Sequence, residues 1–447
     1  MEKDIGTQLA EFAVVTKYED IPKETLEFTK CLTLKTVAGM LAGSTKPSAR
    51  KMAGLIRDKK LPEEVGVMGC GFKTSLWEAI LLNAYFAHAS ELEDDRIDDN
   101  GAVSWDITVI PLLLSLAEKL GLSGKALMEA LVVGLEVHTR TCLFSAIHLG
   151  LYVIPGAVGP AVGAAKALGL GFKETAAAMG LAMSTVPLWI QNFGTDGHYF
   201  ESALMSLQGM MAAEMAKLGL RGNPDIVTYL TRYLGKEKVV PELMVKDLGN
   251  RWVLSEIWIK KYPICFMQHR YVDSIIDLKK EHDLPFEEVE AIEIYASRGR
   301  VEVCNRPDPK TEGDLQFSFQ HNLAVAMLDG DVTLEHITPD AVFDPRLIEA
   351  RSRVKFIADY PTSDLIDDSI RKPAHVVVKT KDGRKLSFER MFPIGHHKEP
   401  LTLEQFRRLY AKFTRGILTE KNISKTAELI LNLEKLNNVK ELINILI

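Results

Sequence analysis

The sequence predicts an α+β protein with a large all-helical domain and a smaller α+β domain. Three observations support this class. The chain has 447 residues, too many for one ordinary core. Helical patterns fill its first half, and strand-like alternation begins after about residue 270. We expect residues 1–268 to form the helical domain, completed by helices at 396–447, and residues 269–395 to form the α+β domain.

The helical segments have recognisable starts and ends. Segment 22–43 begins with proline, carries glutamate in its first turn and ends at glycine, and its apolar residues cover a broad face. Similar joints recur as KLGLSGK (119–125), ALGLGFK (167–173) and KLGLRG (217–222), each with a helix that ends at glycine. The frequent Ala and Gly residues are expected to allow close contacts between helices.

Strand patterns mark the second half. Residues 289–298 alternate apolar and polar side chains, and 374–391 contain Asp-Gly between two strand-like runs, which predicts a hairpin. Residues 317–328 have a helical pattern. The tail from Leu403 is helical again, and its apolar stripe is expected to pack inside the monomer, with a dimer contact as the alternative.

Composition restricts the class of function. Hydrophobic residues make up 47% and charged residues 26%, as in a soluble globular enzyme, and the net charge of −6 gives no reason to expect nucleic acid. The apolar stretches are too short for a membrane span, and the N-terminus does not resemble a secretion signal, so we expect a cytoplasmic protein. The five cysteines are scattered without CxxC spacing, which argues against disulfides and a structural zinc site.

An acidic stretch is the first candidate for chemistry. HASELEDDRIDDNGAVSWD (88–106) holds six carboxylates between Glu91 and Asp99, and it could form a solvated loop, a metal site or a pocket wall. It lacks the register of a calcium loop, so a metal site is disfavoured, and at least half of the carboxylates are expected to be solvated. Glu91 and Asp95 are expected to share one face of a helical turn with His88.

Two further segments carry candidate groups. NFGTDGHYFES (192–202) is expected to present His198 from a turn at a helix start, where an anionic ligand is favoured. IKKYPICFMQHRY (259–271) places Lys260 and Lys261 at the expected domain boundary, where ligand clefts concentrate. A desolvated Lys260 would bind a carboxylate or act as a base.

Five segments, taken in order, resemble the MmgE/PrpD family, which includes 2-methylcitrate dehydratase, cis-aconitate decarboxylase and iminodisuccinate epimerase. The resemblance covers about residues 5–415. It implies a helical domain, an α+β lid domain, a homodimer, and chemistry on small di- or tricarboxylates without metal or cofactor. The segments are NAYFAHASELEDD, VIPLLLSLAEKLGLSGKALMEALVVGLEVHTR, FGTDGHYFESALMSLQGMMAAEMAKLGL, KKYPICFMQHRYVDSIIDL and DLQFSFQHNLAVAML.

The resemblance also implies where the pocket lies. The family's H-x-x-D-x-D-D motif corresponds to residues 88–94, with Asp95 lining the pocket beside it, so the acidic stretch becomes the pocket wall. Lys260 matches the family lysine before Tyr-Pro, and Cys265 falls where another polar side chain is common.

This chain also departs from the family pattern. The His-Pro-Gly step after the acidic motif is replaced by Ser104-Trp105-Asp106, and the lysine of F-G-T-D-x-K is His198 here. A second family histidine falls near Val153, which leaves only His148 and Tyr152 nearby. These changes argue against a plain 2-methylcitrate dehydratase.

We therefore expect a cofactor-independent lyase that removes a proton beside a carboxylate of a small di- or tricarboxylic acid, or decarboxylates it. An epimerase or isomerase, and a family member that binds a ligand without turnover, are the alternatives. The expected catalytic residues are His198, Lys260, Glu91 and Asp95. The expected substrate-binding residues are His88, Ser104, Asp106, Tyr152, Lys261, Cys265 and Phe317.

Overall fold

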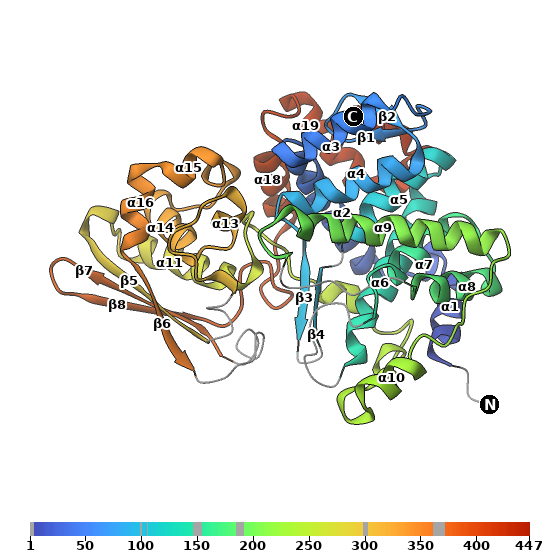
Figure 1. The fold of residues 1–447 in the computed structure, drawn as a ribbon, viewed down its shortest axis with the longest axis horizontal. Helices are drawn as coiled ribbons and strands as arrows, with labels where there is room; N and C mark the ends of the chain where they lie inside the picture. Colours follow the sequence, from blue (N-terminus) through green and yellow to red (C-terminus); the bar gives the residue numbers. More distant parts are fainter. Residues whose placement is uncertain are drawn as a thin grey trace. The chain divides into compact units, whose positions relative to one another are not determined.

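The computed structural model describes residues 4–98, 101–104, 106–145, 154–184, 192–297, 303–360 and 372–447, and it contains two compact units. Unit 1 comprises 1–190, 196–257 and 402–447, and unit 2 comprises 191–195 and 258–401. Unit 1 is mostly helical, whereas unit 2 combines helices with a four-stranded sheet, so the predicted α+β class is confirmed (Figure 1).

Unit 1 is a set of packed helices with two short strand pairs. Its strands are β1 (Val65–Val67), β2 (Phe72–Thr74), β3 (Asp95–Asp98) and β4 (Gly101–Ser104). Its helices are α1 (Ile5–Val15), α2 (Lys23–Ser44), α3 (Pro47–Asp58), α4 (Leu76–Ala89), α5 (Asp106–Leu120), α6 (Gly124–Thr141), α7 (Val158–Ala167), α8 (Phe172–Ala182), α9 (Asp196–Lys217), α10 (Thr228–Leu234), α18 (Leu403–Thr414), α19 (Glu420–Leu431) and α20 (Lys440–Leu446).

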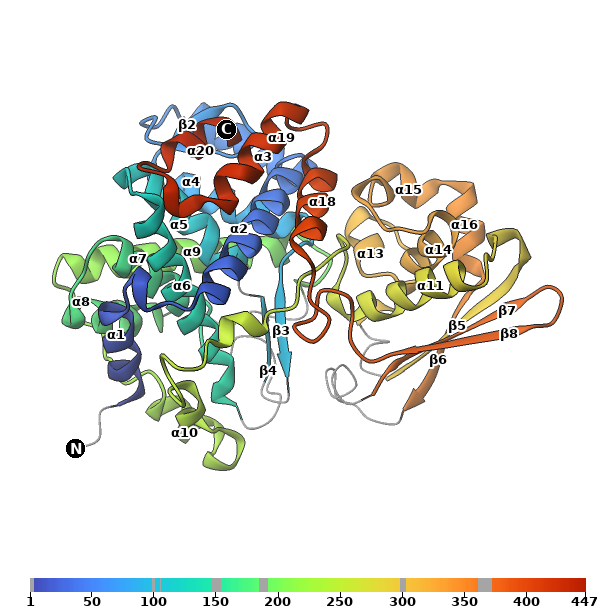
Figure 2. The ribbon, with the colours of Figure 1, turned by 180° about the vertical axis from the view of Figure 1, so that it is seen from behind.

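Helix α2 lies at the centre of unit 1. It was predicted for residues 22–43, and Pro22 occupies the position just before its first turn. Nearly every side chain from its third turn onward is buried, because α4, α5 and α18 pack around it. Figure 2 shows the C-terminal helices α18 and α19 beside α2, so the end of the chain returns to its beginning. The predicted burial of the tail's apolar stripe is confirmed for Leu433, Leu436 and Ile443.

Small residues let the helices approach closely, as the sequence indicated. Gly163 of α7 lies against Gly134 of α6, where an added β-carbon on Gly134 would be 3.1 Å from the Gly163 Cα. Gly159 lies against His138, and an added β-carbon would be 2.2 Å from the His138 Cβ. The predicted glycine joints also form, with positive φ at Gly121 and Gly169 just after α5 and α7.

Unit 2 is built around a mixed sheet in the order β6-β5-β7-β8. β5 pairs in parallel with β6 and antiparallel with β7, and β7 and β8 form the hairpin predicted from Asp-Gly. α11 packs against β7 and β8, and α14 packs against β6. The elements are α11 (His269–Glu281), β5 (Val289–Ser297), α13 (Glu312–Gln316), α14 (Phe319–Asp329), α15 (Pro339–Phe343), α16 (Pro345–Ser352), β6 (Val354–Tyr360), β7 (Ala374–Thr380) and β8 (Lys385–Arg390).

The acidic stretch does not continue the helix before it. Helix α4 ends at Ala89, residues 92–94 belong to no helix or strand, and Asp95 opens strand β3, which pairs antiparallel with β4. The expectation that Glu91 and Asp95 share one helical face with His88 is therefore wrong. Within the described ranges, no helix has the length and apolar composition that crossing a membrane requires.

Replacing Gly43 should destabilise unit 1. A β-carbon there would lie 1.8 Å from the carbonyl oxygen of Phe86 in α4, so the two backbones must separate. We expect Gly43→Ala to lower the free energy of unfolding by about 1–3 kcal/mol in urea titrations. Gly54→Ala in α3 is the control, because nothing lies within 4 Å and alanine favours a helix by up to about 1 kcal/mol. Equal stabilities would contradict the close α2–α4 contact.

Acid should weaken the fold through its buried histidines. Burial lowers the pKa of His138 and of His321 to about 3, from an ordinary value of 6.5. Between these two pKa values the unfolded chain binds protons that the folded chain does not bind. The part of the unfolding free energy that comes from these neutral histidines is therefore complete above pH 6.5 and is lost as the pH falls toward 3. We expect His138→Gln to flatten the slope of unfolding free energy against pH by up to about 1.4 kcal/mol per pH unit. The same slope in wild type and variant would contradict this assignment, and His282→Gln at an exposed position is the control.

Candidate active site

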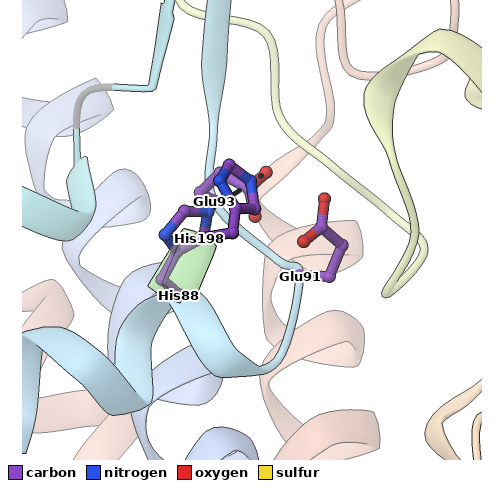
Figure 3. Close-up of side chains that lie close together, drawn as sticks. All are labelled: His88, Glu91, Glu93 and His198. Atoms are coloured by element: carbon purple, nitrogen blue, oxygen red, sulfur yellow. Dashed lines mark ion pairs between the residues drawn. The ribbon is translucent and has the colours of Figure 1, made fainter. Parts of the chain in front are cut away.

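Two histidines and two glutamates meet inside unit 1. One ligand atom from each of His88, Glu91, Glu93 and His198 lies within 4.8 Å of the others (Figure 3). All four side chains are buried, and none is more than 6% exposed. His88 lies in the last turn of α4, the glutamates follow that helix, and His198 lies in the first turn of α9. We call these four residues the His–Glu cluster.

Ser202 of α9 contacts the ring of His88 and orients it. The hydroxyl of Ser202 lies 2.9 Å from the Tyr199 carbonyl and 2.8 Å from the His88 Nδ1. When the hydroxyl donates to the carbonyl, it accepts from a protonated Nδ1 of His88. The other ring nitrogen, Nε2, lies 4.0 Å from Oε1 of Glu93, so the two side chains form an ion pair when the imidazole is protonated.

Helices α4 and α9 hold the two histidines side by side. The ring centroids of His88 and His198 are 4.2 Å apart, and the Tyr199 ring lies 5.4 Å from that of His88. The Tyr85 hydroxyl is 3.1 Å from Asp196, the first residue of α9, and 2.9 Å from the Ser48 hydroxyl. These contacts link the end of α4 to the start of α9, where His198 was predicted to lie.

Glu91 adopts a left-handed backbone conformation with φ of 55°. Its amide donates to the His88 carbonyl at 2.8 Å and so closes the end of α4. For a residue other than glycine, this backbone conformation costs about 1–3 kcal/mol. The turn places the Glu91 carboxylate next to the last helical turn, which carries His88.

A buried ion pair supports the stretch from behind. Lys35 of α2 contacts Asp94 with 2.6 Å between Nζ and Oδ1, and both side chains are inaccessible to solvent. The same ammonium donates to the Leu92 carbonyl. Lys35 therefore binds residues 92 and 94, while Glu91 and Glu93 take part in the His–Glu cluster.

Asp106 completes this support. Its carboxylate accepts from the Asp94 amide at 2.9 Å and from the Thr36 hydroxyl at 2.7 Å. Burial raises the pKa of Asp106, while the Lys35 charge and these donors favour the ionised form. These bonds indicate a positioning function, and the substrate contact expected for Asp106 stays a prediction.

The carboxylates of the stretch are mostly buried. Glu91, Glu93, Asp94 and Asp95 are all at most 4% exposed, so the expectation that at least half of the six are solvated is wrong. The sequence does not show that Lys35 and Ser104 come from other elements to bind Asp94 and Asp95. Asp95 accepts from the Ser104 hydroxyl at 2.7 Å across the β3–β4 pair.

Four further predicted residues belong to unit 2. Lys260 is buried, and its expected partnership with His198 stays a prediction. Lys261 forms an ion pair with Asp273, 2.7 Å between Nζ and Oδ1. Burial raises the pKa of the Cys265 thiol well above its usual value, and Phe317 packs in the hydrophobic core of the unit. Tyr152, Trp105, His148 and Val153 lie outside the described residues.

Several residues of the site were missed. Glu93 stands in the family motif, but the sequence did not predict a function for it, nor for Lys35 or Ser202. A lysine inside a strongly apolar helix, and a serine one turn after His198, are weak signals because both residue types are common in helices. The functions of Lys35 and Ser202 become visible only in the fold, where α2 brings Lys35 to Asp94 and α9 brings Ser202 to His88.

The His–Glu cluster has two chemical uses. Imidazole and carboxylate groups exchange protons near neutral pH, which suits general acid–base catalysis. The same atoms are also ligands that divalent transition metals accept. The sequence disfavoured metal from the calcium-loop register alone, which tested neither histidine.

Removing the Lys35 charge should destabilise unit 1. Lys35→Met leaves the Asp94 carboxylate buried without this ammonium, so we expect a loss of about 3–5 kcal/mol in unfolding free energy. Urea unfolding followed by circular dichroism measures it, with Lys59→Met, at an exposed helix end, as control. A loss no larger than that of the control would show that the pair does not hold the stretch.

Comparisons with known proteins identify the family. The MmgE/PrpD N-terminal domain matches residues 7–232 and the MmgE/PrpD C-terminal domain matches residues 262–435. The chain is 25% identical to the cis-aconitate decarboxylase of Homo sapiens, over 82% of this chain and 79% of that protein. It is 23% identical to the cis-aconitate decarboxylase of Aspergillus terreus, over 99% and 96%. The two domain matches cover most of the chain, and the resemblance noted from its motifs is confirmed: this protein belongs to the MmgE/PrpD family.

Proposed function

We propose that this protein is a cofactor-independent lyase that decarboxylates a small tricarboxylic acid. The observation that carries the proposal is the buried His–Glu cluster, which gathers two imidazoles and two carboxylates in one place. The family membership and the names of the similar proteins favour decarboxylation over dehydration. The expected homodimer and cytoplasmic location stay predictions.

The reaction requires one proton for each carbon dioxide released. The bond between a carboxylate carbon and its neighbour breaks, and the electron pair moves into conjugation with the unsaturated acid. The carbon at the far end of that conjugated system then takes up a proton from an acid of the protein. A group close to that carbon must therefore hold a proton and regain one from water after each turnover.

The cluster offers groups for this proton transfer. His88 presents Nε2 toward Glu93, and its opposite nitrogen is fixed by Ser202, so its orientation is prepared before substrate arrives. His198 lies beside it and is our preferred proton donor, with Glu91 as its partner. Lys260 is proposed to bind a substrate carboxylate and Asp95 to line the pocket, as the family resemblance implies.

The other reactions of this class differ in their products. A dehydratase would remove a proton beside a carboxylate and expel hydroxide, whereas an epimerase would return the proton to the opposite face. The adjacent imidazoles of His88 and His198 are compatible with such a proton exchange. A protein that only binds the acid would show a ligand-induced rise in melting temperature without any product.

Turnover should be measured first with cis-aconitate. We expect proton NMR in deuterated water to show a decarboxylated alkene with one deuterium per molecule, and one equivalent of carbon dioxide. His198→Gln should lower kcat by about 10²–10⁴-fold, because it removes the proposed proton donor. The variant should unfold near the wild-type temperature, which separates loss of chemistry from loss of fold.

The same assay distinguishes the alternatives. Exchange of deuterium into the acid without loss of carbon dioxide would contradict the decarboxylase and support an epimerase. His282→Ala, at an exposed position of unit 2, is the control and should retain wild-type kcat. Lys260→Ala should raise KM if Lys260 binds a carboxylate, and an unchanged KM would remove that function.

A further inference from the structure

The His–Glu cluster is also a set of metal ligands. Two nitrogens and two carboxylate oxygens lie within 4.8 Å of one another, and all four side chains are buried. Zinc binds imidazole and carboxylate in fourfold sites, and other divalent transition metals accept the same groups. The acidic stretch supplies the two glutamates, and α4 and α9 supply the histidines, so the set forms only in the folded unit.

A second observation points to a ligand independently. Histidines that bind metals commonly donate their other ring nitrogen to a hydrogen-bond partner, which fixes the tautomer. His88 has the geometry for this arrangement, because its Nδ1 lies 2.8 Å from the Ser202 hydroxyl while its Nε2 is the nitrogen nearer to Glu93. Helix α9 thus provides one ligand, His198, and the group that orients another.

Distance and charge fit a divalent ion. Ligand atoms of a tetrahedral zinc are separated by about 3.4 Å, given bonds of about 2.0–2.1 Å. The His88 Nε2 to Glu93 Oε1 distance is 4.0 Å and the ligand atoms lie within 4.8 Å of one another, so the side chains need to close by up to about 1.4 Å to bind one ion. A divalent cation attracts carboxylates and accepts the nitrogen lone pair of a neutral imidazole, so both kinds of side chain suit such an ion.

We propose that His88, Glu91, Glu93 and His198 bind one divalent transition-metal ion, and that the bound ion blocks the lyase reaction. The ion occupies the nitrogen lone pairs and carboxylate oxygens that proton transfer would use. The binding stands on the geometry alone, whereas its inhibitory consequence rests on the proposed function.

Calorimetry on the full-length protein, treated with chelator and then freed of it, tests the binding. We expect one zinc ion per chain, and weaker binding of Mg²⁺, which prefers oxygen ligands and retains its water. His198→Lys removes a ligand but keeps the basic group of the family pattern, and it should abolish the zinc signal. Ser202→Ala should weaken binding by about 10–100-fold, as loss of an orienting partner does.

A second variant distinguishes the loss of a metal ligand from the loss of the fold. Glu91→Gly removes a ligand and relieves the left-handed backbone at that position, so it should remain folded while losing zinc. His282→Ala is the control and should bind zinc as the wild type does. Absence of zinc binding to wild type, or equal binding by His198→Lys and Glu91→Gly, would overturn the proposed site.

Inhibition is measured separately. Chelator-treated protein should turn over the substrate, zinc should reduce the rate over the concentration range in which it binds, and chelator should restore the rate. A rate that zinc leaves unchanged or increases would overturn the inhibitory consequence. If no substrate is turned over, the proposed function fails, and calorimetry alone decides the metal site.

Discussion

The site depends on compensating the charge of an acidic stretch that is folded into the protein. Carboxylates cannot be buried without cations or donors, and Lys35 meets this requirement for Asp94 while it also donates to the Leu92 carbonyl. Because Lys35 binds these two positions from one side, Glu91 and Glu93 are left to the side of the histidines. Asp94 is thus bound in the ion pair, whereas Glu91 and Glu93 belong to the His–Glu cluster. The ion pair supports the cluster although none of its atoms belongs to it.

The two histidines reach the cluster through helix packing. His88 ends α4 and His198 begins α9, and these helices contact each other along their length. The Tyr85 contact with Asp196 fixes the helix ends, and Ser202 fixes the ring of His88. A site assembled from two helix ends and one tight turn is prepared in the folded protein, so little conformational entropy remains to be lost when a ligand binds.

Much of the fold was predictable because its signals are local. The period of helix α2, the Asp-Gly of the β7–β8 hairpin and the glycine joints each depend on a few neighbouring residues. The site was only partly predictable, since His198 follows the other three members of the cluster by about one hundred positions and its supporting residues come from other helices. Motifs indicated His88, Glu91 and His198, but the burial of Glu93 and the support from Lys35 arise from packing, which one sequence does not report. The carboxylates were expected in solvent for the same reason.

The departures from the family pattern change what the site can hold. Where the family pattern has a lysine, this chain has His198, and where it has two aspartates, this chain has Glu91 and Glu93. Lysine keeps its proton and repels a metal ion, whereas neutral histidine offers a lone pair to a proton or to a metal. The longer glutamates extend the carboxylates by one methylene each toward the imidazoles. These substitutions replace a permanently charged lysine with a histidine and bring two carboxylates closer to it. The site thereby gains side chains that bind either a proton or a metal ion. Protons and transition-metal ions then compete for identical atoms, so metal availability becomes a determinant of whether the acid–base groups are free to act.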